Sequence, residues 1–301
     1  MKRHFSFIGA GNVAHSLVPY LQKYGFIIDS IISRNYSSAK DLAEGNNVKI
    51  FSDKYEKISK DSDYYIISVN DEQIENAAER ISNLDFDFHT KIFIHLSGAK
   101  TVESLKSLIN KGGNAASIHF MSSFPNKQVR SIENIFGAIE TSDYTTFSIL
   151  SELLKFIRTK PFRISSHNKA LYHLMGIFSL NFISATFNFA EITKKHIDDE
   201  LPQTYELFGE TAKSVINNYV NEKNLFKSLS GPIKRGEIEV IKNHLKVLGD
   251  LDNHNLLLSF IANSISLLSI IQNEQRELTD SHKEIKRLLI SHLTKINNNK
   301  L

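Results

Sequence analysis

The first apolar segment of this chain runs directly into a glycine turn, and this feature constrains the fold more than any other. Residues 5–14 read Phe-Ser-Phe-Ile-Gly-Ala-Gly-Asn-Val-Ala, which contains the pattern Gly9-x-Gly11-x-x-Ala14. Gly9 permits a tight turn, Gly11 lets phosphates approach the backbone, and Ala14 lets a helix pack closely on the strand. Such a turn presents backbone N–H groups at a helix N-terminus, which bind pyrophosphate. We therefore predict a dinucleotide site rather than an ordinary strand–turn–helix, with pyrophosphate contacts from Gly9, Ala10, Gly11, Asn12 and Val13.

The end of the second predicted strand indicates which dinucleotide binds. Strand 28–33 ends in Ser33, Arg34 follows it, and no Asp or Glu stands at this position. An NAD site usually has an acidic residue here, which binds the ribose 2′-hydroxyl. A hydroxyl and a guanidinium suit a 2′-phosphate instead. We predict that the cofactor is NADP and that Ser33 and Arg34 bind its 2′-phosphate; the alternative is that Arg34 is an ordinary surface residue.

Composition narrows the class of protein. The chain has 301 residues, enough for two domains, and its 41% hydrophobic and 23% charged residues are typical of a soluble globular protein. A net charge of +3 is too small to indicate nucleic acid as a partner. The absence of cysteine excludes disulfides and cysteine zinc sites, and no histidine spacing indicates a metal site. No signal peptide precedes the glycine turn, so we expect a cytoplasmic protein.

One uncharged stretch bears on assembly. Residues 170–190 contain no Lys, Arg, Asp or Glu. The length of this uncharged segment is close to that needed to span a membrane. His173, Asn181 and Asn188 lie within it and would be penalised in lipid. We therefore expect no membrane partner. Together with residues 256–271, this stretch has more apolar surface than a small helical domain readily covers, which predicts a homodimer through that domain.

Strand and helix patterns alternate over the first half of the chain, as in βαβ units with a parallel sheet. The predicted strands are 5–8, 28–33, 48–51, 64–69, 92–97, 115–120 and 135–140, and the predicted helices are 12–24, 37–44, 72–82, 101–111 and 143–157. Beyond residue 165 only helices are predicted, at 167–195, 201–221, 237–248, 253–273 and 278–296. The expected fold is an α/β Rossmann domain with a mostly parallel sheet (1–165), followed by an all-α C-terminal domain (166–301).

In a parallel sheet, ligands bind outside the carboxyl ends of the strands. Val69 and Asn70 follow the predicted strand 64–69, and Ser97 and Gly98 end the next one. We predict that these four residues line the nicotinamide side of the site; the alternative is that they are only loop residues.

Six segments, in this order, carry a resemblance that spans nearly the whole chain: Gly9–Ala14, Ser33–Arg34, His95–Ala99, Ser117–His119, Lys169–His173 with Asn181, and Leu229–Glu237. They resemble a two-domain Rossmann-like NADP-binding family, with a C-terminal helical domain of unknown function, related to pyrroline-5-carboxylate reductase and the β-hydroxyacid dehydrogenases. The resemblance implies NADP binding and a dimerising helical domain, but no particular substrate. It makes His119 a substrate-binding candidate, although Phe120 stands where the family usually has proline.

Two side chains at the start of the long helix are the catalytic candidates. Lys169 and His173 are four residues apart and so share one helix face. Lys169 could transfer a proton during hydride chemistry while His173 orients the substrate. The alternative is a solvated lysine and a buried core histidine. This arrangement resembles that of the β-hydroxyacid dehydrogenases, which have Lys and Asn at the same spacing on the equivalent helix. His173 stands at the Asn position here.

Two more residues are substrate-binding candidates. Asn181 is polar within the apolar helix, although it lies too far from Lys169 for both to contact one small substrate. Arg235 could bind a carboxylate or phosphate; the alternative is a rigid connection between helices. The function predicted is an NADP-dependent oxidoreductase acting on a small polar carbonyl, hydroxy acid or imine. The alternative is a non-catalytic NADP-binding regulatory or sensor protein.

Overall fold

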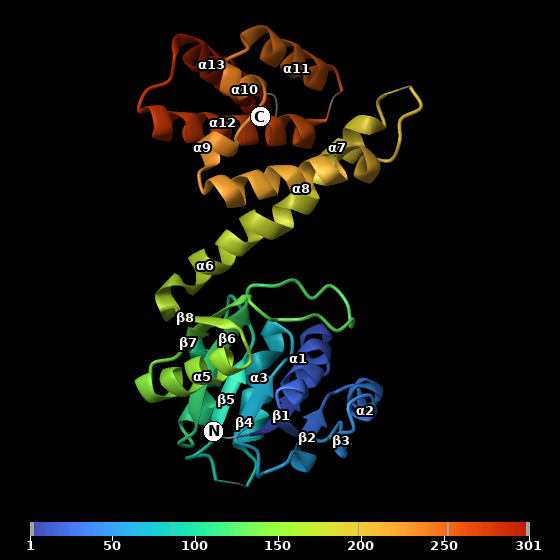
Figure 1. The fold of residues 1–301 in the computed structure, drawn as a ribbon, viewed down its shortest axis with the longest axis vertical. Helices are drawn as coiled ribbons and strands as arrows, with labels where there is room; N and C mark the ends of the chain where they lie inside the picture. The colour runs from blue at the N-terminus through green and yellow to red at the C-terminus, as the bar shows by residue number, and fades with distance from the viewer. Residues whose placement is uncertain (1–2, 86, 198, 252, 299–301) are drawn as a thin grey trace. The chain divides into compact units, whose positions relative to one another are not determined.

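The computed structural model describes residues 3–85, 87–197, 199–251 and 253–298. The chain forms two compact units, Met1–Phe182 and Ile183–Leu301. The first unit is an α/β structure and the second is helical (Figure 1). This is the fold class that the sequence predicted.

The first unit is built on an eight-stranded sheet with the order β3-β2-β1-β4-β5-β6-β7-β8. Neighbouring strands are parallel except for β6 and β7, which are antiparallel. The strands are β1 (His4–Ile8), β2 (Ile27–Ile32), β3 (Ile50–Ser52), β4 (Tyr64–Ile67), β5 (Ile92–His95), β6 (Asn114–Phe120), β7 (Phe136–Glu140) and β8 (Lys160–Arg163).

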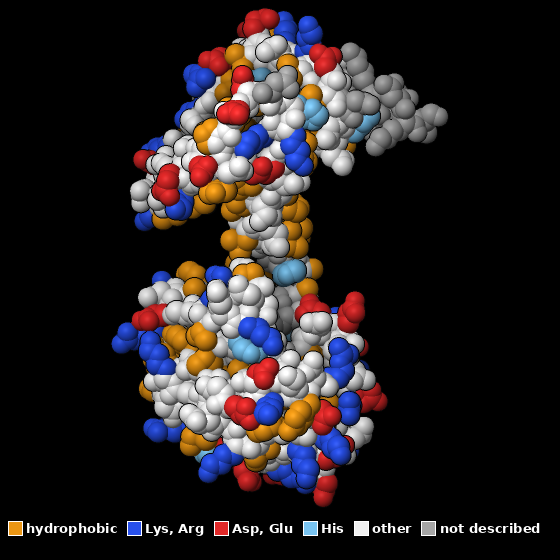
Figure 2. Space-filling view, turned by 90° about the vertical axis from the view of Figure 1, so that its right-hand side faces the viewer, with side chains coloured by type: hydrophobic (Ala, Val, Ile, Leu, Met, Phe, Trp, Pro, Cys, Tyr) orange, Lys and Arg blue, Asp and Glu red, His pale blue; other side chains and the backbone are white. Residues whose placement is uncertain are grey.

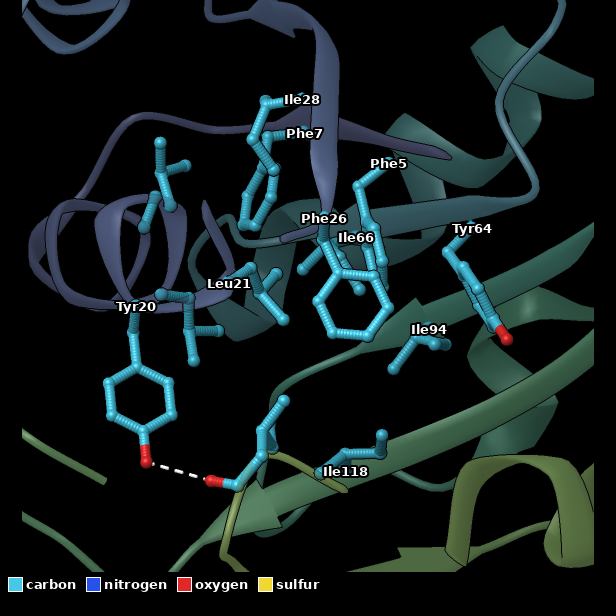
Figure 3. Close-up of a cluster of buried hydrophobic side chains, with 14 of the residues drawn as sticks. Phe5, Phe7, Tyr20, Leu21, Phe26, Ile28, Tyr64, Ile66, Ile94 and Ile118 are labelled. Carbon is cyan, nitrogen blue, oxygen red and sulfur yellow. Dashed lines mark hydrogen bonds between the residues drawn. The ribbon is translucent and has the colours of Figure 1, made fainter. Parts of the chain in front are cut away.

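Helices cover both faces of this sheet, because its strands are apolar on both sides. Phe5 and Phe7 of β1 belong to one core cluster, with helices α1 (Asn12–Lys23), α2 (Tyr36–Glu44) and α5 (Tyr144–Phe156). Ile8 belongs to the other cluster, with α3 (Ile74–Ser82) and the short α4 (Lys106–Ile109). Figure 3 shows the first cluster, where the hydroxyl of Tyr20 donates to the carbonyl of Ile157.

All seven predicted strands are present, with ends that differ by a few residues. The eighth strand, β8, was not predicted, because its sequence Lys160-Pro161-Phe162-Arg163 has no apolar run. The predicted helix 101–111 is in fact a 3-10 turn at Val102–Leu105 followed by the four-residue α4.

The long helix after β8 starts at α6 (Lys169–Gly176), continues through a π-helical segment (Ile177–Asn181) and ends as α7 (Phe182–Lys194). Lys169 and Tyr172 are buried in the first unit. The compact units therefore divide after Phe182, further along the chain than the predicted boundary between 1–165 and 166–301.

Among its described residues, the second unit contains helices and their connections but no strand. After α7 it contains α8 (Thr204–Glu222), α9 (Leu225–Ser228), α10 (Pro232–Arg235), α11 (Ile238–Asp250), α12 (His254–Gln275) and α13 (Asp280–Asn298). Its core joins α11, α12 and α13 through Ile241, Leu245, Ile261, Leu268 and Ile285.

Two helical stretches are long and apolar enough to cross a membrane by length and composition alone, Ser166–Lys194 and His254–Gln275. Such evidence is weak, because the core helix of a soluble protein passes the same test. The apolar window of the first stretch is only 6% buried, against 33% for the second. Hydrophobic side chains gather along the helix that leaves the first unit, whereas charges of both signs are spread over the sheet unit (Figure 2).

Candidate functional site

The glycine turn has the geometry of a phosphate cradle. Gly9 has a φ of +106°, and a Cβ there would lie 2.1 Å from the carbonyl oxygen of Ser68, so only glycine fits between the ends of β1 and β4. Gly11 is the N-cap of α1, and no atom lies within 4 Å of where its Cβ would be. The first turn of α1 contains no acidic residue. Its N–H groups are therefore open to an anion, and the turn fits a pyrophosphate.

A groove of about 250 Å³ opens beside this turn. It contains two arginines and no Asp or Glu among its lining residues, which suits a ligand with several phosphates. The lining residues are Ile8, Gly9, Ala10, Gly11, Ile32, Ser33, Arg34, Asn35, Ser38, Tyr55, Ser68, Val69, Asn70, Gln73, Asn76 and Arg80. Most of the predicted cofactor residues thus lie together.

Asn12 and Val13 do not line the groove with their side chains. Asn12 donates its side-chain amide to the carbonyl of Phe124 at 2.9 Å, and Val13 packs against the core. Both stand in the first turn of α1, so only their backbone N–H groups remain for a phosphate.

At the far end of the groove, Ser33 and Arg34 follow β2 and precede α2. The side chain of Asn35 caps α2 by accepting the N–H of Ser38 at 3.0 Å. The first turn of α2 has no acidic residue. A hydroxyl, a guanidinium and a helix N-terminus therefore meet at the place where the sequence predicted a 2′-phosphate.

The loops after β4 and β5 join the groove to a second cluster of polar side chains. Ser97 donates its hydroxyl to Asp71 at 2.7 Å and accepts the backbone N–H groups of Ala99 and Lys100. Gly98 follows directly: a Cβ there would lie 2.7 Å from Cδ2 of His173 and 2.9 Å from Nε2 of His119. The carboxyl ends of β4, β5 and β6 thus form one continuous edge.

Two histidines and a tyrosine meet at Gly98. Nδ1 of His119 lies 2.9 Å from the hydroxyl of Tyr172, and the rings of His119 and His173 lie 6.1 Å apart. Burial lowers the pKa of His119 to about 4, and the charges of His173 and Lys169 add to this effect. Burial also raises the pKa of Tyr172 to about 12. His119 and Tyr172 are therefore both neutral near pH 7, while Nε2 of His119 faces Gly98.

Lys169 is buried, whereas the alternative interpretation of the sequence was a solvated lysine. Its ammonium is 1% exposed, lies 3.1 Å from the carboxylate of Glu140, and donates to Ser117 at 2.6 Å and to the carbonyl of Lys100. Burial lowers the pKa of Lys169, and Glu140 opposes that shift. Lys169 thus joins α6 to the middle of β6 and the end of β7.

Glu140 is the buried partner that sequence reasoning missed. Burial by itself raises its pKa, but the N–H of Val102 and the hydroxyl of Ser166 donate to the carboxylate and, with Lys169, hold the pKa below its usual range. Glu140 is the last residue of an apolar strand, so its acidic type at a strand end was the only available signal.

Of the two remaining substrate candidates, Asn181 ends the π-helical segment and Arg235 belongs to the second unit. Asn181 is exposed and stands about two helical turns beyond His173. Arg235 lies in the second unit, where its side chain pairs with Glu237 at 2.7 Å. Tyr172 was not among the predicted site residues. It is adjacent to His173 in the sequence, so it was expected to point to another side of the helix.

Two family models match the chain. Residues 4–97 match the family described as NADP oxidoreductase coenzyme F420-dependent, and residues 135–265 match a domain of unknown function, DUF2520. No curated protein matches.

Solved structures with the same fold include several reductases. An NADP oxidoreductase from Bacteroides fragilis is 22% identical with a TM-score of 0.73, over 88% of this chain and 98% of that one. A pyrroline-5-carboxylate reductase from Coxiella burnetii is 15% identical with a TM-score of 0.57, over 93% and 100%. A reductive aminase from Aspergillus terreus, bound to NADPH and ethyl-5-oxohexanoate, is 12% identical with a TM-score of 0.58, over 98% and 95%.

These likenesses show the fold, and the family models identify the two parts of the chain. The chain therefore combines a Rossmann-like segment that matches the NADP oxidoreductase model with a following segment that matches DUF2520, the composition that the sequence predicted.

Proposed function

We propose that this chain is an NADP-dependent oxidoreductase that acts on a small polar carbonyl, hydroxy acid or imine. One observation carries the proposal: a continuous line of contacts runs from the glycine turn, through Ser68 and the Asp71–Ser97 hydrogen bond, to Gly98 and the two histidines. This line follows the carboxyl ends of adjacent strands, where ligands bind in such sheets.

The groove residues would hold the cofactor. The N–H groups at Gly11 and the first turn of α1 would bind the pyrophosphate, and Ser33 and Arg34 the 2′-phosphate. Val69, Asn70, Ser97 and Gly98 would lie beside the nicotinamide. When bound, the cofactor supplies or accepts a hydride.

The histidine cluster would handle the substrate. Neutral His119, with Nδ1 paired to Tyr172, can hold a substrate oxygen or nitrogen at Nε2. His173 is partly exposed, and we assign it the proton transfer that accompanies hydride transfer, because imidazole is the commonest general acid and base.

The role of Lys169 in this proposal is to position other groups. Its ammonium is enclosed by Glu140, Ser117 and the carbonyl of Lys100, so it fixes the start of α6 on the sheet. It thereby sets the place of His173 one turn later. The reductive aminase and pyrroline-5-carboxylate reductase among the similar structures support a carbonyl or imine as the reducible group.

We further propose a cytoplasmic homodimer formed through the helical region. The support is the uncharged stretch 170–190, which together with residues 256–271 has more apolar surface than a small helical domain readily covers. Asn181 and Arg235 remain candidates for substrate contact in that assembly.

The test is NADPH oxidation by the purified protein with ketones and with ketone and amine mixtures, and NADP⁺ reduction with hydroxy acids. The wild type should turn over the cofactor with at least one of these classes. His173→Ala should reduce turnover roughly 10²- to 10⁴-fold while NADPH binding stays nearly unchanged. Tight NADPH binding without turnover on any class would favour the non-catalytic sensor instead.

A further inference from the structure

The adenosine end of the groove contains a second arginine that the cofactor prediction did not use. Arg80 comes from α3, whose residues Ile74, Ala77, Ala78 and Ile81 are buried in the core. Asn76 and Arg80 on the other face of this helix line the groove, together with its N-cap residue Gln73. The helical repeat thus separates a core face from a groove face.

A buried tyrosine holds the guanidinium of Arg80. The Cζ atom of Arg80 lies 4.2 Å from the centroid of the Tyr55 ring, which is only 9% exposed. A guanidinium at this distance is attracted by the ring quadrupole and loses little freedom when it binds a ligand. Tyr55 therefore acts as a platform that fixes Arg80 at the wall of the groove.

Arg34 lines the same groove as Tyr55 and Arg80. Both arginines lower the pKa of Tyr55, against the larger raising effect of its burial. Among the described residues, neither Arg34 nor Arg80 forms an ion pair with a carboxylate. The groove thus holds two guanidiniums without an acidic partner, at the end where Ser33 and the N-terminus of α2 lie.

We propose that Arg80, held on Tyr55, forms the second half of a two-arginine clamp on the 2′-phosphate of the nucleotide, opposite Arg34. This proposal rests on the NADP site of the proposed function and adds a residue that determines selectivity. A phosphomonoester with a charge near −2 is matched by two guanidiniums, whereas the ribose hydroxyl of NAD offers no charge to either.

Calorimetric binding of adenosine 2′,5′-bisphosphate and adenosine 5′-monophosphate to the full chain tests the clamp without needing turnover. Arg80→Met should weaken the bisphosphate about 10-fold or more, and the monophosphate far less. Arg80→Lys should keep part of the selectivity, because the charge remains. Tyr55→Phe should resemble the wild type, and Tyr55→Leu should lose selectivity, because only the aromatic face holds the guanidinium.

Arg287→Met is the matched control, since it removes one exposed positive charge from the second unit and should change neither affinity. Thermal unfolding of Arg80→Met should match the wild type, because the side chain is exposed. An equal loss for both ligands, or no loss, would overturn the clamp. A wild type that does not prefer the bisphosphate would overturn both the clamp and the NADP preference. Selective binding without NADPH turnover would leave the clamp intact and reject only the reductase.

Discussion

At the scale of single residues, Gly98 is the position where the backbone conformation and the proposed chemistry meet. Its Cα lies so close to His119 and His173 that a methyl group would overlap both rings. From strand order alone, the sequence predicted that Gly98 lines the nicotinamide side of the site. It could not show that two imidazoles, 54 residues apart in the sequence, converge there, because that depends on how α6 packs on the sheet.

Gly98→Ala should therefore displace the imidazoles while it leaves the phosphate cradle intact. We expect turnover with NADPH to fall at least about 10-fold, since a small misplacement of a catalytic group has large effects. NADPH affinity should change little. Gly249→Ala is the control, because nothing lies within 4 Å of that Cβ position. Wild-type turnover in Gly98→Ala would show that the histidine geometry is not needed.

The buried histidine at the end of β5 should make the stability of the protein depend on pH. Nε2 of His95 donates to the carbonyl of Thr101, its Nδ1 accepts the N–H of Ser97, and burial lowers its pKa to about 4. In the unfolded chain a histidine gains its proton near pH 6.5. The unfolded state therefore binds more protons between these values, and stability falls as pH decreases from about 6.5 to about 4.

Urea unfolding of the wild type and His95→Gln at pH 7 and pH 5 measures this contribution. The variant should be less stable at pH 7, and the difference between the two proteins should shrink at pH 5, because only the wild type loses stability through this group. A difference that stays constant or grows with acid would contradict the assignment.

At the scale of elements, the buried ion pair between Lys169 and Glu140 connects α6 to β7. The strands themselves were predictable, because apolar runs ending at Gly, Ser or Asn identify them. The ion pair was not predictable, because it depends on how α6 packs against the end of β7 and the middle of β6. Strand β8 was not predicted because it lies at the edge of the sheet, where a strand does not need an apolar sequence.

Removing one member of this pair should destabilise the first unit. Lys169→Met leaves the Glu140 carboxylate buried without its cation, which costs about 3–5 kcal/mol. Lys169→Met combined with Glu140→Gln should recover a large part of that loss, because the unpaired charge is gone. Urea unfolding followed by circular dichroism checks both variants. Full stability in Lys169→Met would indicate that the pair contributes nothing to the fold.

At the scale of the whole molecule, apolar side chains that stay exposed point to a second copy of the chain. Phe178 is 61% exposed on the π-helical segment, and Val215 and Val220 of α8 are 52% and 60% exposed. The uncharged character of residues 170–190 was visible in the sequence and predicted burial.

Light scattering at micromolar concentration should give twice the mass of one chain. Phe178→Lys should shift the protein toward monomer, because it places a charge on the surface proposed to be buried. Tyr144→Lys, at a 71% exposed position on α5, is the control and should leave the mass unchanged. A wild-type monomer under these conditions would reject the homodimer.

The structure of the protein with NADP⁺ bound tests the central claim most directly. The account predicts the pyrophosphate at Gly11 and the first turn of α1, the 2′-phosphate between Arg34 and Arg80, and the nicotinamide beside Gly98, with His119 and His173 facing it. A nucleotide bound elsewhere, or a nicotinamide directed away from Gly98, would contradict both the reductase and the role assigned to its histidines.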